Sequence, residues 1–265
     1  MTNSPASPLS PLPTLFLGHG TPLNAVEDNV WSRGWRGVGE ALAGVRSVLC
    51  VSAHWFAEGS FVTGNAWPET IHDFSGFPEE LYRVRYPAPG SPELAGRVRE
   101  LLGAERVAAS EEWGLDHGAW SVLRHLRPAA DLPVVQLSVD YRLPPAEHLA
   151  LGRALAPLRA EGVLVLGSGN LVHNLRHALT HYDDPETPAW ATQFDAEAAR
   201  ALEQHDSAYL IRAVETATGR QAHPTLDHYL PLLYPLGAAD ETAEVRFPLV
   251  GFDLNSLSMR AVQWG

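Results

Sequence analysis

The chain has 265 residues, of which 45% are hydrophobic and 19% are charged, a balance typical of a globular protein with a substantial core. Its net charge of -12 argues against binding to nucleic acid or to an anionic membrane surface, since both require clustered positive charge. We expect a cytoplasmic protein, because the single cysteine, Cys50, cannot build a disulfide framework and no apolar run approaches the roughly 20 residues of a membrane span.

The first half of the chain alternates apolar runs with segments of helical pattern. Its start is rich in Ser and Pro and lacks the charged beginning of a signal peptide. A stretch rich in Pro, Gly and aromatic residues predicts a long ordered excursion, a kind of loop that is often functional. In order, we expect a disordered lead-in at 1–13, a strand at 14–17, a helix at 27–43, strands at 47–52 and 61–63, the excursion at 68–92, and helices at 92–102 and 116–126.

The second half continues the same alternation. In order, we expect a strand at 133–138, a helix at 145–158, a strand at 162–166, a turn at 167–170, helices at 171–179 and 189–216, a segment at 223–234 that begins as a helix, and a strand at 244–250. Alternating strands and helices favour an α/β fold, here one domain over 14–265 with a mostly parallel central sheet and helices on both faces.

Three histidines follow apolar runs, namely His19, His54 and His173. Ligands of open α/β sheets bind outside the carboxyl ends of the strands, where side chains that are distant in sequence converge. Imidazole is a ligand for Zn, Fe, Ni and Cu, so this placement predicts a site for one divalent metal ion. For any one of these histidines alone, the alternative is a hydrogen-bonded core or surface residue.

Other histidines are weaker candidates. His228 could supply a further ligand from the start of a helix, and its neighbour Asp227 is a rival, although adjacent helical residues do not face the same way. His177 forms an H-x-x-x-H pair with His173, but the glutamate of the zinc-protease motif is absent, so we interpret His177 as structural. His117, between glycines and tryptophans, is either an acid, a base or substrate hydrogen-bond donor, or a capping residue.

Six segments in a fixed order together resemble the class III extradiol ring-cleavage dioxygenases, in the branch similar to 4,5-DOPA dioxygenase. The resemblance extends from about residue 15 to the segment at 256–259. The segments are Leu17-Gly-His-Gly-Thr-Pro-Leu-Asn24, Ser52-Ala-His-Trp55, Ile71-His-Asp-Phe-Ser-Gly-Phe77, Trp113-Gly-Leu-Asp-His-Gly118, Gly167-Ser-Gly-Asn-Leu-Val-His-Asn174 and His228-Tyr-Leu-Pro-Leu-Leu-Tyr234.

The resemblance implies a non-haem Fe(II) site that opens a catechol ring with O₂. It assigns His19 and His54 as metal ligands, and places His228 where protocatechuate-cleaving relatives use a glutamate ligand. It makes His173 either a fourth ligand or the base beside the metal, and His117 a residue that faces substrate and oxygen. With neutral ligands only, the site could also accept Zn(II), which has no second oxidation state for this chemistry.

The expected partners are therefore a small aromatic diol and O₂, and the oligomeric state stays open. Two other functions remain, a non-enzymatic metal or small-molecule binding protein and a zinc-dependent hydrolase on the same fold. The sequence has no nucleophile elbow, P-loop or dinucleotide-binding fingerprint. We interpret Cys50 as a buried packing residue and not as a nucleophile. Four aromatic residues are candidates to wall the pocket, with core packing as the alternative for each: Trp55, Phe74, Phe77 and Trp120.

Overall fold

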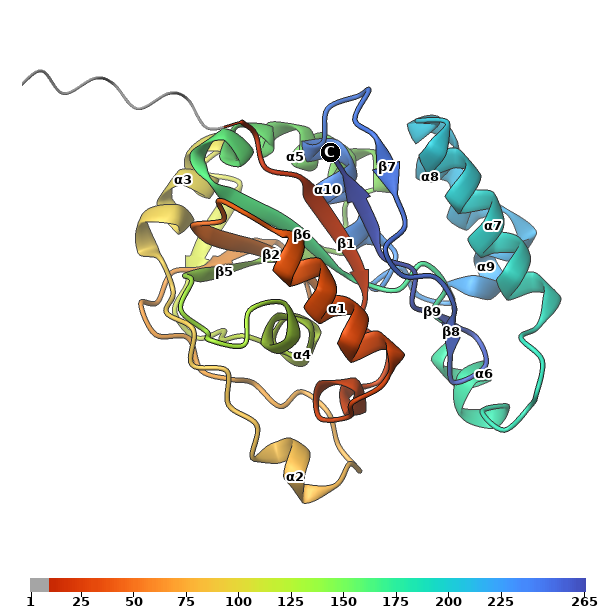
Figure 1. The fold of residues 1–265 in the computed structure, drawn as a ribbon. Coiled ribbons are helices and arrows are strands. Elements are labelled where there is room, and N and C mark those ends of the chain that lie inside the picture. The colour runs from red at the N-terminus through yellow and green to blue at the C-terminus, as the bar shows by residue number, and fades with distance from the viewer. Residues whose placement is uncertain (1–9) are drawn as a thin grey trace, which may run out of the picture.

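A twisted sheet of eight strands lies at the centre of the molecule, and a separate two-stranded hairpin lies beside it (Figure 1). The computed structural model describes residues 10–265. The strands are β1 (Thr14–Gly18), β2 (Ser47–Ala57), β3 (Ser60–Thr63), β4 (Val107–Ser110), β5 (Val134–Asp140), β6 (Val163–Gly169), β7 (Val245–Arg246), β8 (Phe252–Asp253), β9 (Leu257–Ser258) and β10 (Val262–Trp264).

Helices connect most of these strands. The α-helices are α1 (Val30–Ala41), α2 (Glu79–Tyr82), α3 (Pro92–Leu102), α4 (His117–Leu126), α5 (Pro145–Ala154), α6 (Leu175–Thr180), α7 (Ala189–Glu203), α8 (Ser207–Arg212), α9 (Ala217–Ala222) and α10 (Leu233–Ala238). The short 3-10 helices are η1 (Pro22–Ala25), η2 (Ala156–Glu161), η3 (Ala213–Glu215) and η4 (Leu230–Leu232).

The strand order in the large sheet is β4-β3-β5-β2-β6-β1-β10-β7. The four central strands β5, β2, β6 and β1 are parallel, while β3 meets β5 antiparallel and β10 and β7 add an antiparallel edge beyond β1. The fold is thus the single α/β domain that the sequence predicts, with a mixed, mostly parallel sheet. Because the central strands are parallel, their carboxyl ends lie at one edge, where a ligand can bind.

Two hydrophobic cores cover the two faces of the sheet. Successive residues of β1 alternate between them, since Leu15 and Leu17 pack on one side and Phe16 on the other. The first side is covered by α1 and α4, which Figure 1 shows next to each other. The second side is covered by α3, α5 and α10, and the same core continues into α7 and α9. Helices on both faces explain why the central strands are almost wholly apolar.

The predicted start of the chain differs from the structure near β1. Residues 1–9 of the expected lead-in lie outside the described residues. Leu12, however, is buried and exchanges hydrogen bonds with Arg159. The Leu12 N–H donates to the Arg159 carbonyl at 3.2 Å, and the Arg159 Nε donates to the Leu12 carbonyl at 2.6 Å. These contacts fix the segment that leads into β1.

Three predicted elements in the second half are wrong in extent. The long helix at 189–216 is divided into α7, α8 and η3, because His205 adopts a left-handed conformation with φ of 55°. The segment at 223–234 is irregular at first and becomes helical only from η4. The strand at 244–250 shrinks to the two residues of β7, and the sequence reading missed β4 and β10.

Candidate metal centre

His19 lies directly after β1, as the sequence predicts. The last residue of β1, Gly18, pairs with Gly169 at the end of β6, and the His19 N–H donates to the Gly169 carbonyl at 2.9 Å. A Cβ at Gly18 would lie 2.7 Å from the backbone of Met259, so only glycine allows this close approach. The turn after β1 therefore holds His19 at the carboxyl edge of the sheet with little freedom.

The sequence predicts that His54 follows a strand, but in the structure it lies within the longer strand β2. The pairing of β2 with β5 is regular up to Val51 and resumes at Phe56, with a shift of register between them. Such bulges redirect a side chain and are common beside active sites. The irregular segment turns His54 toward the carboxyl edge, where a regular strand would have continued past it.

His228 reaches the same edge from an irregular segment that crosses the end of β6, not from a helix start. Its carbonyl accepts a hydrogen bond from the Asn170 N–H at 3.0 Å. A Cβ at Gly169 would lie 2.2 Å from the His228 carbonyl oxygen, and a Cβ at Gly167 would lie 2.3 Å from that of Pro231. Because Gly167 and Gly169 have no side chains, the backbone of the segment that carries His228 can pack directly against β6.

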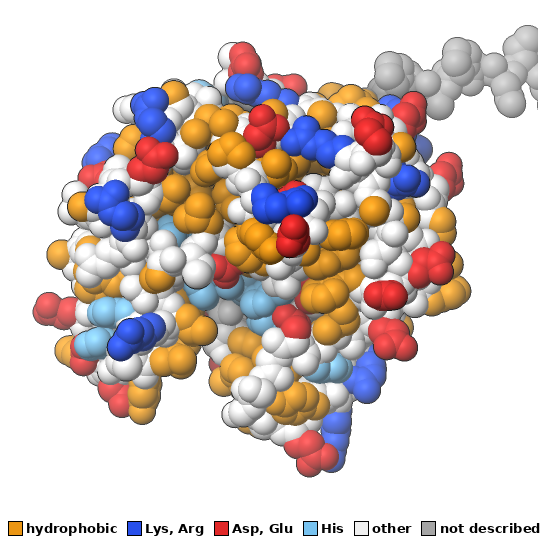
Figure 2. Space-filling view, turned by 180° about the vertical axis from the view of Figure 1, so that it is seen from behind, with side chains coloured by type: hydrophobic (Ala, Val, Ile, Leu, Met, Phe, Trp, Pro, Cys, Tyr) orange, Lys and Arg blue, Asp and Glu red, His pale blue; other side chains and the backbone are white. Residues whose placement is uncertain are grey.

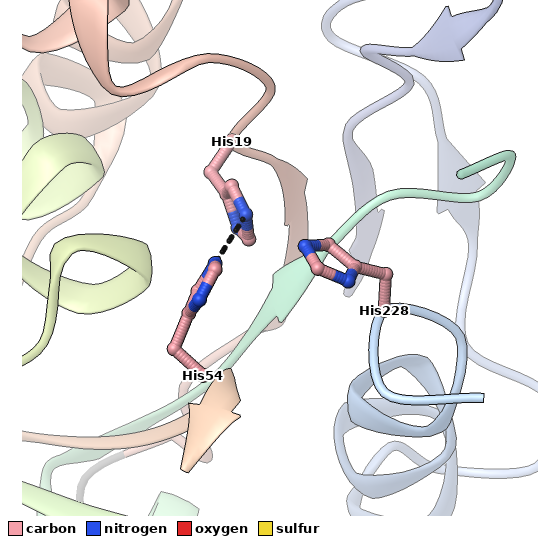
Figure 3. A group of neighbouring side chains, drawn as sticks. All are labelled: His19, His54 and His228. Carbon is pink, nitrogen blue, oxygen red and sulfur yellow. Dashed lines mark hydrogen bonds between the residues drawn. The ribbon is translucent and has the colours of Figure 1, made fainter. Parts of the chain in front are cut away.

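The side chains of His19, His54 and His228 converge from these three segments (Figure 3). Their ring centroids are 5.0 to 5.1 Å apart, and one nitrogen of each lies within 4.8 Å of the others. The Nε2 atoms of His19 and His54 face each other at 3.1 Å. Three imidazole nitrogens therefore point at one small volume.

The other ring nitrogen of each histidine meets a hydrogen-bond acceptor. Ser168 Oγ donates to the Gly118 carbonyl at 2.5 Å and so accepts from His19 Nδ1 at 3.0 Å. The Nδ1 of His54 lies 3.2 Å from Asp73, and the Nδ1 of His228 donates to Asp227. Each Nδ1 thus carries the proton, which leaves the Nε2 lone pairs free.

This donor set fits a divalent metal ion. Two facing lone pairs at 3.1 Å repel each other unless a proton or a cation lies between them. Burial, followed by the nearby His54, holds the pKa of His19 well below its usual value, whereas for His54 the effect of burial is outweighed by the hydrogen bond to Asp73, which raises its pKa. Neutral, preoriented imidazoles are the ligands that Zn(II) and Fe(II) accept.

Asp73 links one of these histidines to His117. Its carboxylate accepts from the backbone N–H and from the Nδ1 of His117, both at 2.9 Å, while also facing His54. Burial raises the pKa of Asp73, but the hydrogen bonds from His117 and His54 more than offset this and hold it far below its usual range. Burial, followed by the nearby His54, lowers the pKa of His117 to about 4, so the ring is uncharged near neutral pH and its Nε2 carries a lone pair.

His117 itself is fixed by the start of α4. Asp116 caps the helix by accepting from the Ala119 N–H at 3.1 Å, and it accepts from Ser52 Oγ and Gln136 Nε2, both at 2.6 Å. A Cβ at Gly118 would lie 2.4 Å from Ser52 Oγ and 2.8 Å from the ring of His54. The helix start can approach β2 this closely only because residue 118 is glycine.

His173 lies before α6, not within it, and its ring stacks on that of His228. The ring centroids are 3.4 Å apart and the planes are inclined by only 4°. Burial, followed by the neighbouring His228, holds the pKa of His173 well below its usual value, so the ring is neutral. It lines the same pocket as the three converging histidines.

His177 is not brought to this site. Its Nδ1 meets Ser256 Oγ at 3.2 Å, and its ring stacks on His181 with centroids 4.1 Å apart. This is the structural role that the sequence reading preferred for His177. The H-x-x-x-H pair does not form, because α6 begins only at Leu175, after His173.

A cavity of about 440 Å³ opens above the histidines. Figure 2 shows histidine side chains at the bottom of a hollow whose surroundings are largely hydrophobic. Phe74 and Phe77 line the cavity, as proposed from the sequence. Trp55 instead stacks on Trp113 with centroids 5.2 Å apart, and Trp120 is buried and donates its Nε1 to the Ile71 carbonyl.

Two carboxylates at this site accept hydrogen bonds from the histidine rings, a role that the sequence predicts for neither. The sequence makes Asp227 a rival ligand to His228 on a helix, but the segment is irregular, and the Asp227 carboxylate accepts a hydrogen bond from its neighbour His228. Asp73 lies in the 71–77 segment, which carries part of the family resemblance. Its place in this segment is the one feature of the sequence that points to a role for Asp73 at the site. Each carboxylate lies near two histidines, but it already accepts ring N–H groups, so the convergent set of His19, His54 and His228 is the better metal site.

Over residues 13–261 the chain matches the family described as the catalytic LigB subunit of aromatic ring-opening dioxygenase. The chain therefore belongs to the LigB family of aromatic ring-opening dioxygenases. It is 47% identical over 261 residues to the 4,5-DOPA dioxygenase extradiol of Escherichia coli (strain K12), covering 96% of this chain and 95% of that protein. It is 40% identical over 242 residues to the protein of the same name from Beta vulgaris, covering 87% and 88%.

A solved structure supports the same assignment. The crystal structure of an uncharacterised protein from Escherichia coli K12 superimposes with a TM-score of 0.84 at 43% sequence identity. The match covers 96% of this chain and all of the other. The α/β architecture is therefore shared over nearly the whole length, including the edge that carries the histidines.

Proposed function

We propose that this protein is a non-haem Fe(II)-dependent extradiol dioxygenase that opens the ring of a catechol with O₂. The observation that carries the proposal is the convergence of three imidazole nitrogens, of His19, His54 and His228, at the floor of an apolar cavity. Membership of the LigB family and the names of the relatives support the same reaction. Bound at these three residues, Fe(II) would supply the redox chemistry between catechol and O₂ that no side chain offers.

His173 acts as the proton acceptor beside the metal and not as a fourth ligand. A ligand bonds through a lone pair in the plane of its ring, at about 2.0–2.1 Å from the ion. Because the rings of His173 and His228 lie 3.4 Å apart in nearly parallel planes, their lone pairs run side by side and do not converge, so His19, His54 and His228 would hold the ion without His173. The neutral ring is instead placed to take the proton of a catechol hydroxyl.

His117 handles a second proton beside His54, whose ring centroid lies 3.7 Å from its own. Its Nδ1 proton is committed to Asp73, so its Nε2 accepts a proton first and returns it later in the reaction. Phe74 and Phe77 flank the aromatic ring of the substrate and exclude water from it. The substrate partners are therefore a small aromatic diol and O₂.

A zinc-dependent hydrolase is the second candidate, because three histidines without a carboxylate also form a zinc ligand set. A binding protein without activity would retain the ligands but would not need His117 and His173 as proton acceptors. Among the described residues, no helix is long and apolar enough to cross a membrane. A cytoplasmic location remains an expectation from the sequence.

Oxygen uptake separates these functions. The protein is loaded with Fe(II) or with Zn(II) without air, and a panel of catechols is then added with O₂. We expect one O₂ consumed per ring opened, with a yellow product, in the iron form alone. The control is His54→Ala, which should lose both metal and turnover, whereas His173→Ala should lose turnover while retaining metal. An iron-loaded protein that opens no catechol would refute the proposal.

A further inference from the structure

Among the described residues, no arginine or lysine side chain lines the cavity above the histidines. Its lining residues include no arginine, and the chain contains no lysine. The acidic residue of the lining, Asp73, is held in place by its contacts with His54 and His117 and offers a ligand carboxylate only a like group. A ligand carboxylate in this part of the described structure would find no cation to pair with, so it would lose hydration without compensation.

The cavity also offers few neutral hydrogen-bond donors. Outside the histidines and Asp73, Thr21 is the one lining residue with a polar side chain. The Thr21 Oγ accepts from the Leu23 N–H as the cap of η1, which leaves its own O–H as a single neutral donor. The other lining side chains are those of proline, leucine and phenylalanine, so a charged substituent would meet almost no compensating contacts.

Leucines form the rim of this cavity. Leu175 and Leu179 of α6 are 47% and 60% exposed, and both line it. Exposed leucines at the mouth of a cavity provide an apolar surface for a ligand that extends beyond the buried floor. A substituent that points outward from a ring held over the histidines would therefore contact them.

Leu254 adds an apolar wall from a strained position. It lies in the three-residue loop between β8 and β9, with φ of 44°, and Asn255 follows with φ of 67°. Leucine rarely adopts this left-handed conformation, which glycine and asparagine accept more readily. The Asn255 amide holds the loop by donating to the carbonyls of Asp184 and Glu186. Residue 254 is thus a leucine that lines the cavity, although its backbone conformation favours glycine or asparagine.

We propose that the substrate is a catechol whose ring substituent is uncharged and apolar, such as a short alkyl chain, and that Leu175, Leu179 and Leu254 select it. This inference rests on the proposed function but goes beyond it. The relatives' names refer to DOPA, whose side chain carries both a carboxylate and an ammonium group. On this view DOPA is a poor substrate here.

The test compares catechols that differ in charge at similar size. The panel contains 4-propylcatechol, 3-(3,4-dihydroxyphenyl)propionate and DOPA, with turnover by the Fe(II) form measured as O₂ uptake. We expect kcat/KM for 4-propylcatechol to exceed that of both charged compounds by roughly 10- to 100-fold, since each leaves a charged group unpaired. In the redox-inert Zn(II) form, calorimetry should show the same order of affinity.

A charge-introducing variant tests the residues. Leu179→Arg places a cation at the exposed rim and should raise kcat/KM for the propionate relative to 4-propylcatechol by roughly tenfold. The matched control is Val250→Arg, which adds the same charge at a residue that is 55% exposed and outside the cavity lining, and should leave the ratio unchanged.

The outcomes separate this inference from the proposed function. If the iron form turns over charged catechols as well as or better than 4-propylcatechol, the inference is wrong and the dioxygenase proposal stands. If no catechol is turned over, the dioxygenase proposal fails, and the calorimetric order in the Zn(II) form still decides the inference. Equal or tighter binding of the charged compounds, or no binding of any of them, overturns it.

Discussion

At the scale of single residues, Asp73 controls two histidines at once. Its carboxylate accepts the Nδ1 protons of His54 and His117 and the backbone N–H of His117. An asparagine cannot accept all three, because one of its two terminal atoms is a donor. The residue therefore fixes which nitrogen of each ring is free.

We expect Asp73→Asn to weaken metal binding by roughly 10- to 100-fold, as is usual when the partner of a ligand histidine is removed. Competition with a chromogenic chelator measures the affinity. The matched control is Asp131→Asn, which removes the same charge from an exposed pair with Arg127 and should change the affinity by less than about threefold. An affinity equal to that of the wild type would show that Asp73 does not hold His54.

His223 makes the stability depend on pH. Burial lowers its pKa to about 4, while Nε2 donates to the Leu171 carbonyl at 2.9 Å and Nδ1 has no partner in the described structure. As the pH falls from about 6.5 toward 4, the unfolded chain takes up this proton first, so folding stability is lost in that window and is complete above it.

We expect His223→Gln, which retains a donor but does not titrate, to reduce the loss of unfolding free energy between pH 7 and pH 5 by about 1–2 kcal/mol. Urea denaturation at the two pH values measures the difference, and the comparison cancels any loss of stability that the substitution causes at both. Identical pH dependence in the two proteins would contradict the assignment.

At the scale of elements, the end of β6 decides where His228 lies. The segment that carries His228 rests on Gly167 and Gly169, where any side chain would displace its carbonyls. This contact joins the chain at residue 169 to residue 228, and nothing local in either segment reveals it. The resemblance therefore indicates His228 as a candidate ligand, but the backbone contact that supports it could not be predicted.

We expect Gly169→Ala to push the His228 backbone out of position and to lower metal affinity by at least roughly tenfold. The same chelator competition measures it. Gly96→Ala is the control: Gly96 is a helical residue of α3 with no neighbouring atom within 4 Å of an added Cβ, and alanine there should stabilise the helix by about 0.5–1 kcal/mol. Equal affinities in both variants would show that the segment adapts freely.

Elements could be predicted where the local pattern decides them. Ser91 and Pro92 mark the start of α3, and the Ser91 side chain caps the helix by accepting from the Leu94 N–H. The break at His205 and the bulge that holds His54 could not be predicted, because they depend on packing between distant segments. The short strands β4 and β10, which the sequence does not predict, contain too few residues to show a periodicity.

At the scale of the whole molecule, the alternation of strands and helices was sufficient to predict the fold and the edge where ligands bind. That the five histidines gather at one cavity was expected from the resemblance and is seen in the structure, while their roles remain proposals. The carboxylate partners of the rings come from loops whose course no sequence pattern defines.

The three histidines come from segments spread over most of the chain, so a bound ion should stabilise the whole fold. At a free metal concentration about 100 times the dissociation constant, binding adds about 2.7 kcal/mol, which corresponds to a rise in Tm of roughly 5–10 °C. Thermal unfolding with and without Zn(II) measures it. His228→Ala should abolish the rise and His177→Ala should retain it, and a rise in both would place the ion elsewhere.

The left-handed leucine in the β8–β9 loop also has an evolutionary consequence. Holding Leu254 at a positive φ costs the fold on the order of 1–3 kcal/mol, and a glycine at the same position would recover part of it. Selection for thermal endurance alone should therefore replace this leucine, whereas selection for turnover of one substrate should retain it. The identity of residue 254 thus records which of the two pressures has acted on a lineage.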